Sequence, residues 1–348
     1  MGNIDQSEKK NGGNGTLFTP SLLNALLISA LAFVMVYARP FLIGAVNVYK
    51  RDLCGRIVLI TGSNTGLGYA MAEEMLAMNA TVILVGRDRA RVDAAALRLL
   101  VNVNPNSCAK VDSSFLLDLA SLSSVRSFAE AFLKKYSKLD ILVLNAGVFH
   151  IPKGRTVDGL ETTLQVNHLG HHLLYSLLEP IVFETAKETS DVRVLVLSSS
   201  GQFWGDLSGD ALSDLNFEKR IDVQQGYQLY TQSKLCNVLF AKELARRTSV
   251  KSGVSSYSID PGAVATDIFR HYPPIIEKAF NILFKTPKQG AQTQIYLAAA
   301  PLSEIQRFNG GFFSDCAHSS WINPQALNET LAKELWSISD QLVGITTQ

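Results

Sequence analysis

Apolar runs rich in β-branched residues alternate with helix-like patterns along most of this chain. Continuous apolar strands separated by helices are typical of a parallel sheet that is covered on both faces. No repeat or low-complexity linker divides residues 51–348, so we predict one doubly wound α/β domain there. The predicted strands lie at 57–60, 81–85, 115–117, 141–144, 192–197, 254–259 and 311–313. The first predicted helix lies near 67–78, and the second follows the strand 81–85 and ends at 98. Further helices are predicted at 122–136, at 159–178, around 230–234 and at 325–342.

The amino-terminal part follows a different pattern. No charged residue occurs from Asn11 to Ala38, and the most apolar part of this stretch is 21–37. About 20 apolar residues span a bilayer, so this segment is long enough to cross or nearly cross one. A secretory signal peptide is the alternative. The run is longer than a usual signal core, and no small-x-small cleavage site precedes Arg39. We therefore predict that residues 1–50 form a tail and an uncleaved transmembrane helix.

The charges around this segment bear on its orientation. Lysine and arginine give a weak bias toward a cytosolic carboxyl-terminal side, with Lys9 and Lys10 before the segment and Arg39, Lys50 and Arg51 after it. Sequons at Asn14, Asn79 and Asn328 would be glycosylated only in a lumen, which keeps a lumenal enzyme open as the alternative. We expect the endoplasmic reticulum membrane, with lipid droplets or mitochondrial membranes as alternatives, and a catalytic domain that faces the cytosol.

Composition excludes some classes of function. Lysine plus arginine (32) balances aspartate plus glutamate (31), which argues against nucleic-acid binding. The four cysteines show no Cys-x-x-Cys spacing, so we expect neither a disulfide framework nor a zinc site. Reduced thiols in a cytosol-facing domain are the expectation for Cys54, Cys108, Cys236 and Cys316.

A glycine-rich turn follows the first predicted strand. Gly62, Gly66 and Gly68 are spaced Gly-x-x-x-Gly-x-Gly, and a predicted helix begins directly after them. Glycines at such a place let the backbone approach a pyrophosphate, which the amides and dipole of the helix start would bind. The position between strand and helix therefore predicts a dinucleotide site.

The end of the second strand selects between two cofactors. A carboxylate at this place would accept hydrogen bonds from a free ribose 2′-hydroxyl. The chain instead has Arg87, whose guanidinium would bind a 2′-phosphate. We predict NADP(H) as the preferred cofactor and NAD(H) as the alternative. Asp88 leaves the choice open, because its carboxylate would either pair with Arg87 or face the ribose.

Tyr230 and Lys234 are four residues apart and share one face of a predicted helix. A nearby ammonium favours ionisation of a phenol, whose ordinary pKa is near 10. We therefore expect a lowered pKa for Tyr230 and proton exchange with a substrate. An acid–base pair beside a dinucleotide site predicts hydride-transfer chemistry.

These motifs together resemble the short-chain dehydrogenase/reductase family, and in detail its membrane-anchored retinol dehydrogenase branch. The resemblance covers roughly residues 51–345 and implies a Rossmann-type fold. The family-wide motifs are the glycine turn, Tyr230-x-x-x-Lys234, Asn145-Ala-Gly147, Val166-Asn-His-Leu-Gly170, the serines 198–200 and Pro261-Gly262. The branch-like motifs are Lys285-Thr-Pro287, Gly290-Ala-Gln-Thr293, Phe313-Ser-Asp-Cys316 and Leu335-Trp336. Leu144 stands where the family more often has a first asparagine.

The resemblance also implies roles for single residues. Tyr230 would be the general acid in reduction and the base in oxidation, and Ser199 would bind the reacting oxygen, with Ser198 or Ser200 as alternatives. Lys234 would hold the nicotinamide ribose, and Asn167 would support a water relay. The residues expected to bind the cofactor are Gly62, Ser63, Asn64, Thr65, Gly66, Leu67, Gly68, Arg87, Asp118, Asn145, Gly147, Tyr230, Lys234, Pro261, Gly262 and Thr266.

Two further segments carry less information. His168, His171 and His172 cluster on one predicted helix, but no carboxylate or cysteine completes a metal set, so we interpret them as packing residues and expect no metal. The apolar stretch 266–287 is either a surface helix or a mobile lid over the substrate that touches the bilayer.

The sequence therefore predicts an NADP(H)-dependent oxidoreductase that interconverts a lipophilic alcohol and its carbonyl. Retinol or retinal, a sterol and a long-chain aldehyde are the substrates considered. A homodimer is a further expectation. The alternative is a catalytically silent dinucleotide sensor or membrane scaffold, which loss of Tyr230 or Lys234 would have favoured.

Overall fold

The computed structural model describes residues 44–149, 151, 154–219, 226–248, 253–265 and 284–345. The predicted transmembrane segment 21–37, Thr266 and most of the predicted lid lie outside these residues. No helix among the described residues is long and apolar enough to cross a membrane. The described residues belong to one compact unit, Ile43–Gln348.

Eight strands in the described part of the chain form one sheet in the order β3-β2-β1-β4-β5-β6-β7-β8. All neighbours pair in parallel except β7 and β8, which are antiparallel. The strands are β1 (Ile57–Thr61), β2 (Thr81–Val85), β3 (Lys110–Asp112), β4 (Ile141–Leu144), β5 (Val192–Leu197), β6 (Val254–Asp260), β7 (Phe312–Ser314) and β8 (Ala317–His318). This arrangement confirms the predicted doubly wound, mostly parallel sheet.

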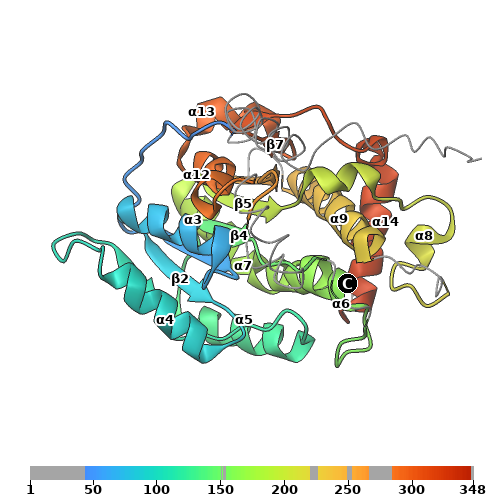
Figure 1. The fold of residues 1–348 in the computed structure, drawn as a ribbon, viewed down its shortest axis with the longest axis horizontal. Helices are drawn as coiled ribbons and strands as arrows, with labels where there is room; N and C mark the ends of the chain where they lie inside the picture. The colour runs from blue at the N-terminus through green and yellow to red at the C-terminus, as the bar shows by residue number, and fades with distance from the viewer. Residues whose placement is uncertain are drawn as a thin grey trace, which may run out of the picture. The chain divides into compact units, whose positions relative to one another are not determined.

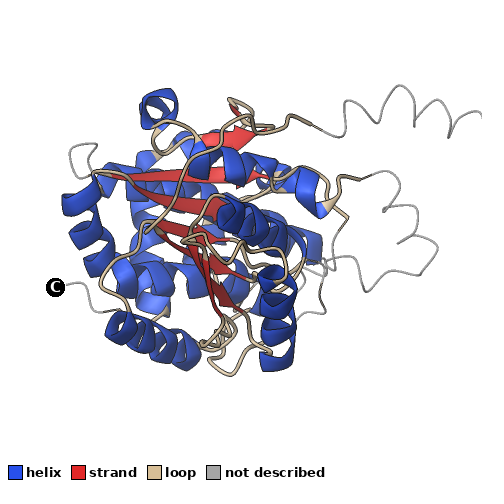
Figure 2. Ribbon diagram, turned by 90° about the vertical axis from the view of Figure 1, so that its left-hand side faces the viewer, coloured by secondary structure: helices blue, strands red, loops and turns tan. Residues whose placement is uncertain are grey.

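Helices cover both faces of the sheet (Figures 1 and 2). The longer ones are α3 (Gly66–Ala77), α4 (Arg89–Leu100), α5 (Leu122–Lys135), α7 (Gly170–Thr189), α9 (Gly226–Arg247), α12 (Gln292–Ala299) and α14 (Glu329–Leu342). The short ones are α6 (Thr162–Leu164), α8 (Asp210–Ser213), α11 (Pro287–Gly290) and α13 (Leu302–Ile305). Four further turns are the π-helical η2 (Gln165–Leu169) and the 3₁₀ segments η3 (Ser200–Trp204), η6 (Gln306–Phe308) and η7 (Pro324–Leu327).

The sheet separates two apolar cores. One core packs α5, α7, α9 and α14 against the sheet, and the other packs α3, α4 and α12. Figure 1 shows α9 and α14 side by side. Strands β1 and β4 are neighbours although β2 and β3 lie between them in sequence. The chain therefore reverses direction across the sheet at this point, where α/β proteins bind ligands beyond the carboxyl ends of the strands.

The predicted strand at 115–117 is wrong. The third strand is Lys110–Asp112, a partly exposed edge strand without a continuous apolar run. Phe115 instead packs its ring against Phe128 and Phe132 of α5. An apolar run that anchors a loop on a helix thus resembled a strand more than the true edge strand did.

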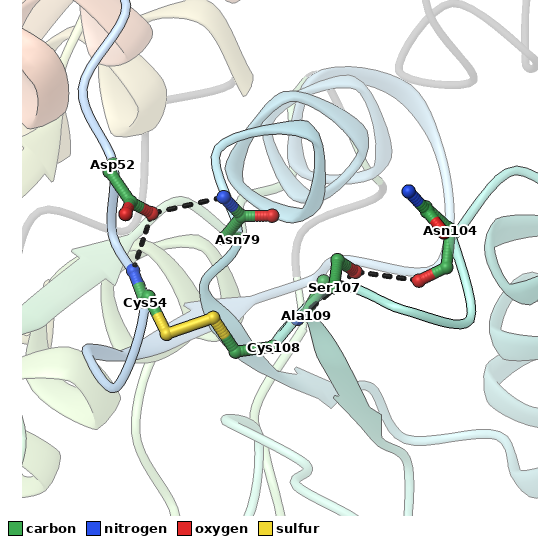
Figure 3. The surroundings of a disulfide bond; sticks show 7 residues. All are labelled: Asp52, Cys54, Asn79, Asn104, Ser107, Cys108 and Ala109. Atoms are coloured by element: carbon green, nitrogen blue, oxygen red, sulfur yellow. Dashed lines mark hydrogen bonds between the residues drawn. A yellow bond between two sulfur atoms is a disulfide. The ribbon is translucent and has the colours of Figure 1, made fainter.

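The prediction of reduced thiols is also wrong for two of the four cysteines. Cys54 and Cys108 form a disulfide bond with a Cα–Cα distance of 5.6 Å (Figure 3). Cys54 lies just before β1 and Cys108 just before β3, and these strands are separated only by β2. A sequence separation of 54 residues concealed this proximity. Among the described residues, Cys236 and Cys316 are free thiols.

Candidate active site

The glycine turn connects β1 to α3 in the predicted manner. Gly62 and Gly66 have φ values of +64° and +57°, a region that favours glycine. A Cβ atom at Gly68 would lie 2.5 Å from the carbonyl oxygen of Gly62 and 2.6 Å from Nδ2 of Asn145. The glycines are therefore required by backbone conformation at the first two positions and by close packing at the third.

Thr61 holds this turn against the loop after β4. Its Oγ1 accepts hydrogen bonds from the backbone amides of Asn145 (2.8 Å) and Ala146 (2.9 Å). Its carbonyl oxygen accepts from Nδ2 of Asn145 at 2.8 Å. The same hydroxyl lies 2.9 Å from Nε2 of His171. Thr61 was not among the predicted site residues, because a threonine at the end of a strand carries no distinctive local pattern.

A cavity of about 460 Å³ extends from the glycine turn to α9. It brings together most residues predicted to bind the cofactor, namely Gly62, Asn64, Thr65, Gly66, Leu67, Arg87, Asp118, Asn145, Gly147, Tyr230, Lys234 and Pro261. Ser63, Gly68 and Gly262 do not line it. Ser63 instead accepts a hydrogen bond on Oγ from the backbone amide of Val85 at 2.9 Å.

The residues present fit a dinucleotide. Oδ1 of Asn145 is buried and has no hydrogen-bond partner within the described part of the chain. A buried acceptor of this kind requires a donor, which a ligand in the cavity would supply. Glycines at 62 and 66 keep the backbone of the turn clear of side chains where a pyrophosphate would lie.

The far end of the cavity is lined by two arginines and by Asp88. Arg87 and Arg91 line it, and Arg87 is exposed without an ion pair among the described residues. Asp88 caps α4 by accepting a hydrogen bond from the backbone amide of Arg91 at 3.1 Å. Arg89 points elsewhere and donates to the carbonyl oxygens of Ser113 and Ser114. The carboxylate of Asp88 is thus occupied with the helix start, which leaves Arg87 available to an anion.

Tyr230 and Lys234 lie on the first turns of α9 at the other end of the cavity. The Nζ atom of Lys234 is 5.5 Å from the centroid of the Tyr230 ring and donates to the carbonyl oxygen of Leu197 at 3.0 Å. Phe149 packs edge-on against the Tyr230 ring at 4.7 Å. The two side chains therefore share one face of the helix, as the spacing predicts.

The expected lowering of the Tyr230 pKa is wrong for this structure. Burial of the phenol raises its pKa to about 12, and a hydrogen bond with Ser199 only partly offsets this. Burial also lowers the pKa of Lys234 to about 8, against an opposing effect of Asp260. Loss of solvent is the dominant cause for both groups, and sequence spacing alone does not reveal it.

Of the three adjacent serines, Ser199 is the one beside the phenol. Its hydroxyl forms the hydrogen bond that acts on the pKa of Tyr230, and it also accepts from the backbone amide of Gly201 at 3.1 Å. Ser198 is buried and donates to the carbonyl oxygen of Lys234 at 2.7 Å. Ser200 begins η3.

Asn167 lies in the π-helical turn η2 and is buried. Its Oδ1 accepts from the backbone amide of Val148 at 2.8 Å, and its Nδ2 donates to Oγ of Ser233 at 3.0 Å. Its backbone carbonyl accepts from Nδ2 of Asn237 at 3.0 Å. Asn167 thus connects the loop after β4 to α9, the helix that carries Lys234.

A buried carboxylate near the reactive pair, that of Asp260, was not among the predicted site residues. Asp260 ends β6, and its carboxylate accepts from the backbone amides of Gly262 (3.0 Å) and Ser200. Burial raises its pKa, and its charge acts on both Tyr230 and Lys234 by raising their pKa values. An isolated acid before Pro-Gly gives no signal of this contact in the sequence.

The three histidines have separate partners. His168 lies 3.0 Å from Oγ of Ser339, and His172 lies 2.7 Å from Oδ1 of Asp340, both on α14. Burial lowers the pKa of His168 and of His171 to about 3, so both rings are neutral near pH 7. No group of three potential metal ligands occurs among the described residues. The histidine contacts join η2 and α7 to α14 and to the end of β1.

Comparison with known proteins agrees with this geometry. The short chain dehydrogenase family model matches residues 56–203. The chain belongs to the short-chain dehydrogenase/reductase family and is an oxidoreductase of that family, which uses a nicotinamide dinucleotide.

Its relatives place it in the retinol dehydrogenase branch. Retinol dehydrogenase 14 of Homo sapiens is 40% identical over 306 residues, which cover 84% of this chain and 87% of that protein. Retinol dehydrogenase 12 of Homo sapiens is 38% identical over 325 residues, covering 92% and 97%. A crystal structure of an uncharacterised protein from Mycobacterium paratuberculosis aligns with a TM-score of 0.65 and 29% identity, covering 86% and 98%.

Proposed function

We propose that this chain is an NADP(H)-dependent oxidoreductase that interconverts a lipophilic alcohol and its carbonyl. The observation that carries the proposal is one cavity with Tyr230 and Lys234 at one end and the unpaired Arg87 at the other. Ser199 forms a hydrogen bond with the Tyr230 hydroxyl at the first of these ends. Retinol or retinal is the first candidate substrate because of the relatives' names, followed by sterols and long-chain aldehydes.

The glycine turn, Asp118, Asn145, Pro261 and Lys234 would hold the cofactor along the cavity. When bound, the nicotinamide supplies or takes up the hydride. Arg87 and Arg91 favour NADP(H), because a guanidinium binds a 2′-phosphate through charge-assisted hydrogen bonds.

Tyr230 moves the proton. In carbonyl reduction its hydroxyl donates a proton to the substrate oxygen, and in alcohol oxidation the phenolate accepts it. Ser199 donates a hydrogen bond to the same oxygen and stabilises charge that develops there. The ammonium of Lys234 stabilises the phenolate, and Asn167 fixes the loop and helix on which this arrangement depends.

The apolar segment 21–37 would anchor the enzyme in a membrane, most simply that of the endoplasmic reticulum. A substrate dissolved in the bilayer matches this placement. The expected homodimer is tested by light scattering of the detergent-solubilised protein.

A two-cofactor activity screen on membrane fractions tests the proposal. Retinal, ketosteroids, long-chain aldehydes and a water-soluble sugar are each assayed with NADPH and with NADH. We expect consumption of NADPH with at least one lipophilic carbonyl. Activity confined to the sugar defeats the lipid assignment, and cofactor binding without turnover on any substrate favours the dinucleotide sensor.

A further inference from the structure

Three aromatic rings form a cluster on the surface of the domain. Trp204 and Trp321 are 57% and 47% exposed. Phe203 stacks on Trp321 with ring centroids 4.8 Å apart and planes 5° apart. Trp204 packs edge-on against Phe203 at 5.9 Å and Trp321 at 5.8 Å. We name Phe203, Trp204 and Trp321 the aromatic patch. Exposed apolar side chains that cluster together are typical of an interaction surface, whereas single exposed ones are ordinary.

Buried hydrogen bonds hold the patch in place. Gln202 is buried and donates from Nε2 to the carbonyl oxygen of Trp321 at 3.2 Å. Asn323, also buried, donates from Nδ2 to the carbonyl oxygens of Phe203 (3.0 Å) and Gly205 (2.7 Å). The two tryptophans therefore come from distant segments that are joined at the backbone, and the patch is a built feature of the fold.

The patch is connected to the reactive end of the cavity. Phe203 and Trp204 belong to η3, which begins directly after Ser199. A Cβ atom at Gly201, in the same segment, would lie 3.3 Å from Cε1 of Tyr230. Contacts that hold η3 in place therefore also bear on the positions of Ser199 and Tyr230.

The chain enters the domain at the carboxyl edge of the same sheet. A Cβ atom at Gly44 would lie 2.2 Å from Oδ1 of Asp315 and 2.6 Å from Nζ of Lys285. Lys285 is buried, bridges to Asp315 at 2.6 Å, and lies beside Gly262, which follows Pro261 of the cavity. Gly44 lies only seven residues after Tyr37, the last residue of the apolar segment 21–37. Seven residues span at most about 25 Å.

From these observations we propose that the aromatic patch lies in the interfacial layer of the bilayer and that the substrate enters from the membrane beside it. The inference rests on the proposed anchoring by residues 21–37. Tryptophan favours this layer because its ring is apolar and its indole N–H is a hydrogen-bond donor. If residues 21–37 are anchored, the length of the connection limits the distance of Gly44 from the membrane to about 25 Å. Phe203 and Trp204 of the aromatic patch follow the carboxyl end of β5, and a bilayer is the partner that we assign to the patch.

The tryptophan content of the chain allows a direct test. Its three tryptophans are Trp204, Trp321 and Trp336, and Trp336 is buried against Phe240. The full-length protein is reconstituted in phosphatidylcholine vesicles with and without bromine on the acyl chains near the headgroup. We expect a loss of tryptophan emission in the brominated vesicles and weaker quenching by aqueous acrylamide than in detergent. The Trp204→Phe/Trp321→Phe variant should lose the bromine effect, because only Trp336 then emits.

Equal emission in brominated and plain vesicles overturns the proposal. A second contrary outcome is tryptophan emission that is protected from acrylamide but is not quenched by bromine. If this protection also depends on protein concentration, the patch contacts a second copy of the chain and the proposal is overturned. Vesicle flotation distinguishes failure of the patch proposal from failure of the proposed membrane anchor. Protein that does not float with the vesicles contradicts the anchor. As a functional check, Trp204→Ser/Trp321→Ser should raise KM for a vesicle-dissolved carbonyl while leaving kcat for a short water-soluble aldehyde unchanged. Equal effects on both substrates also count against the proposal.

Discussion

The ammonium of Lys234 lies 5.5 Å from the ring centroid of Tyr230, and burial lowers the pKa of this lysine to about 8. The lysine is therefore cationic below pH 8 and increasingly neutral above it. Because the cation stabilises the phenolate, the protonation state of Lys234 controls how readily Tyr230 exchanges a proton.

A pH dependence of carbonyl reduction follows from this pair. We expect kcat/KM to fall as the pH rises through about 8, because the ammonium is lost there while Tyr230, with a pKa of about 12, stays protonated. Steady-state assays from pH 6 to 10 with a saturating cofactor measure it. The Lys234→Arg variant keeps its charge over this range, so any activity it retains should lack the inflection. A flat profile in the parent protein is incompatible with this role of Lys234.

The charge of Asp260 should affect the pH at which kcat/KM falls, because it acts on both Tyr230 and Lys234. Its charge raises the pKa of Lys234, so Asp260→Asn should move the inflection to lower pH. Activity at pH 6 should fall less than about tenfold, because the residue acts only through its neighbours. Asp93→Asn, an exposed position on α4, is the matched control and should leave the profile unchanged. An Asp260→Asn profile that superimposes on the parent profile shows that this coupling is absent.

Arg87 should decide the choice between cofactors. Arg87→Ala removes a charge-assisted contact worth about 1.5–3 kcal/mol, so KM for NADPH should rise roughly 10–100-fold while KM for NADH changes little. Arg89→Ala is the control, because Arg89 bonds to Ser113 and Ser114 and does not line the cavity. Equal losses with both cofactors would mean that Arg87 supports the fold and not the 2′-phosphate.

The Cys54–Cys108 disulfide should contribute to stability. In the chain-entropy account, closing a loop of this length stabilises a protein by about 4 kcal/mol, and removal commonly costs 2–5 kcal/mol. We expect Cys54→Ser/Cys108→Ser to unfold at lower guanidinium concentration, and a reducing agent to do the same to the parent protein. Cys316→Ser is the control and should unfold like the parent. Insensitivity of the parent to reduction contradicts a formed disulfide.

The Cys54–Cys108 disulfide also bears on which side of the membrane the domain lies. Disulfides persist in oxidising compartments and are reduced in the cytosol, whereas the lysine and arginine pattern around 21–37 weakly favours a cytosolic domain. Protease treatment of intact microsomes decides between them. A protected domain with blocked Cys54 and Cys108 is lumenal, and a digested domain with maleimide-reactive thiols is cytosolic.

Local patterns predicted the fold and the reactive pair because both depend on short spacings. The apolar strands, the glycine turn and Tyr230-x-x-x-Lys234 each lie within one or two elements. Contacts between distant segments escaped prediction for the same reason. Cys54 meets Cys108 across β2, and Asp260 meets Ser200 between two strand ends.

Burial and side-chain direction were likewise not available from the sequence. The Tyr230 pKa rises because the phenol loses solvent, which the spacing of Tyr230 and Lys234 does not show. Ser63 has the expected place in the glycine turn, but its hydroxyl bonds to the backbone of Val85 instead of lining the cavity. Phe115 has the pattern of a strand but packs its ring on α5.

Turnover by Tyr230→Phe tests the central claim most directly. The variant loses only the hydroxyl that exchanges the proton, so kcat for reduction of a lipophilic carbonyl should fall about 10²–10⁴-fold. NADPH affinity, measured by fluorescence titration, should stay close to that of the parent. Tyr227→Phe, an exposed position one turn earlier on α9, is the matched control and should keep full activity. A Tyr230→Phe protein that turns over like its parent would contradict the account.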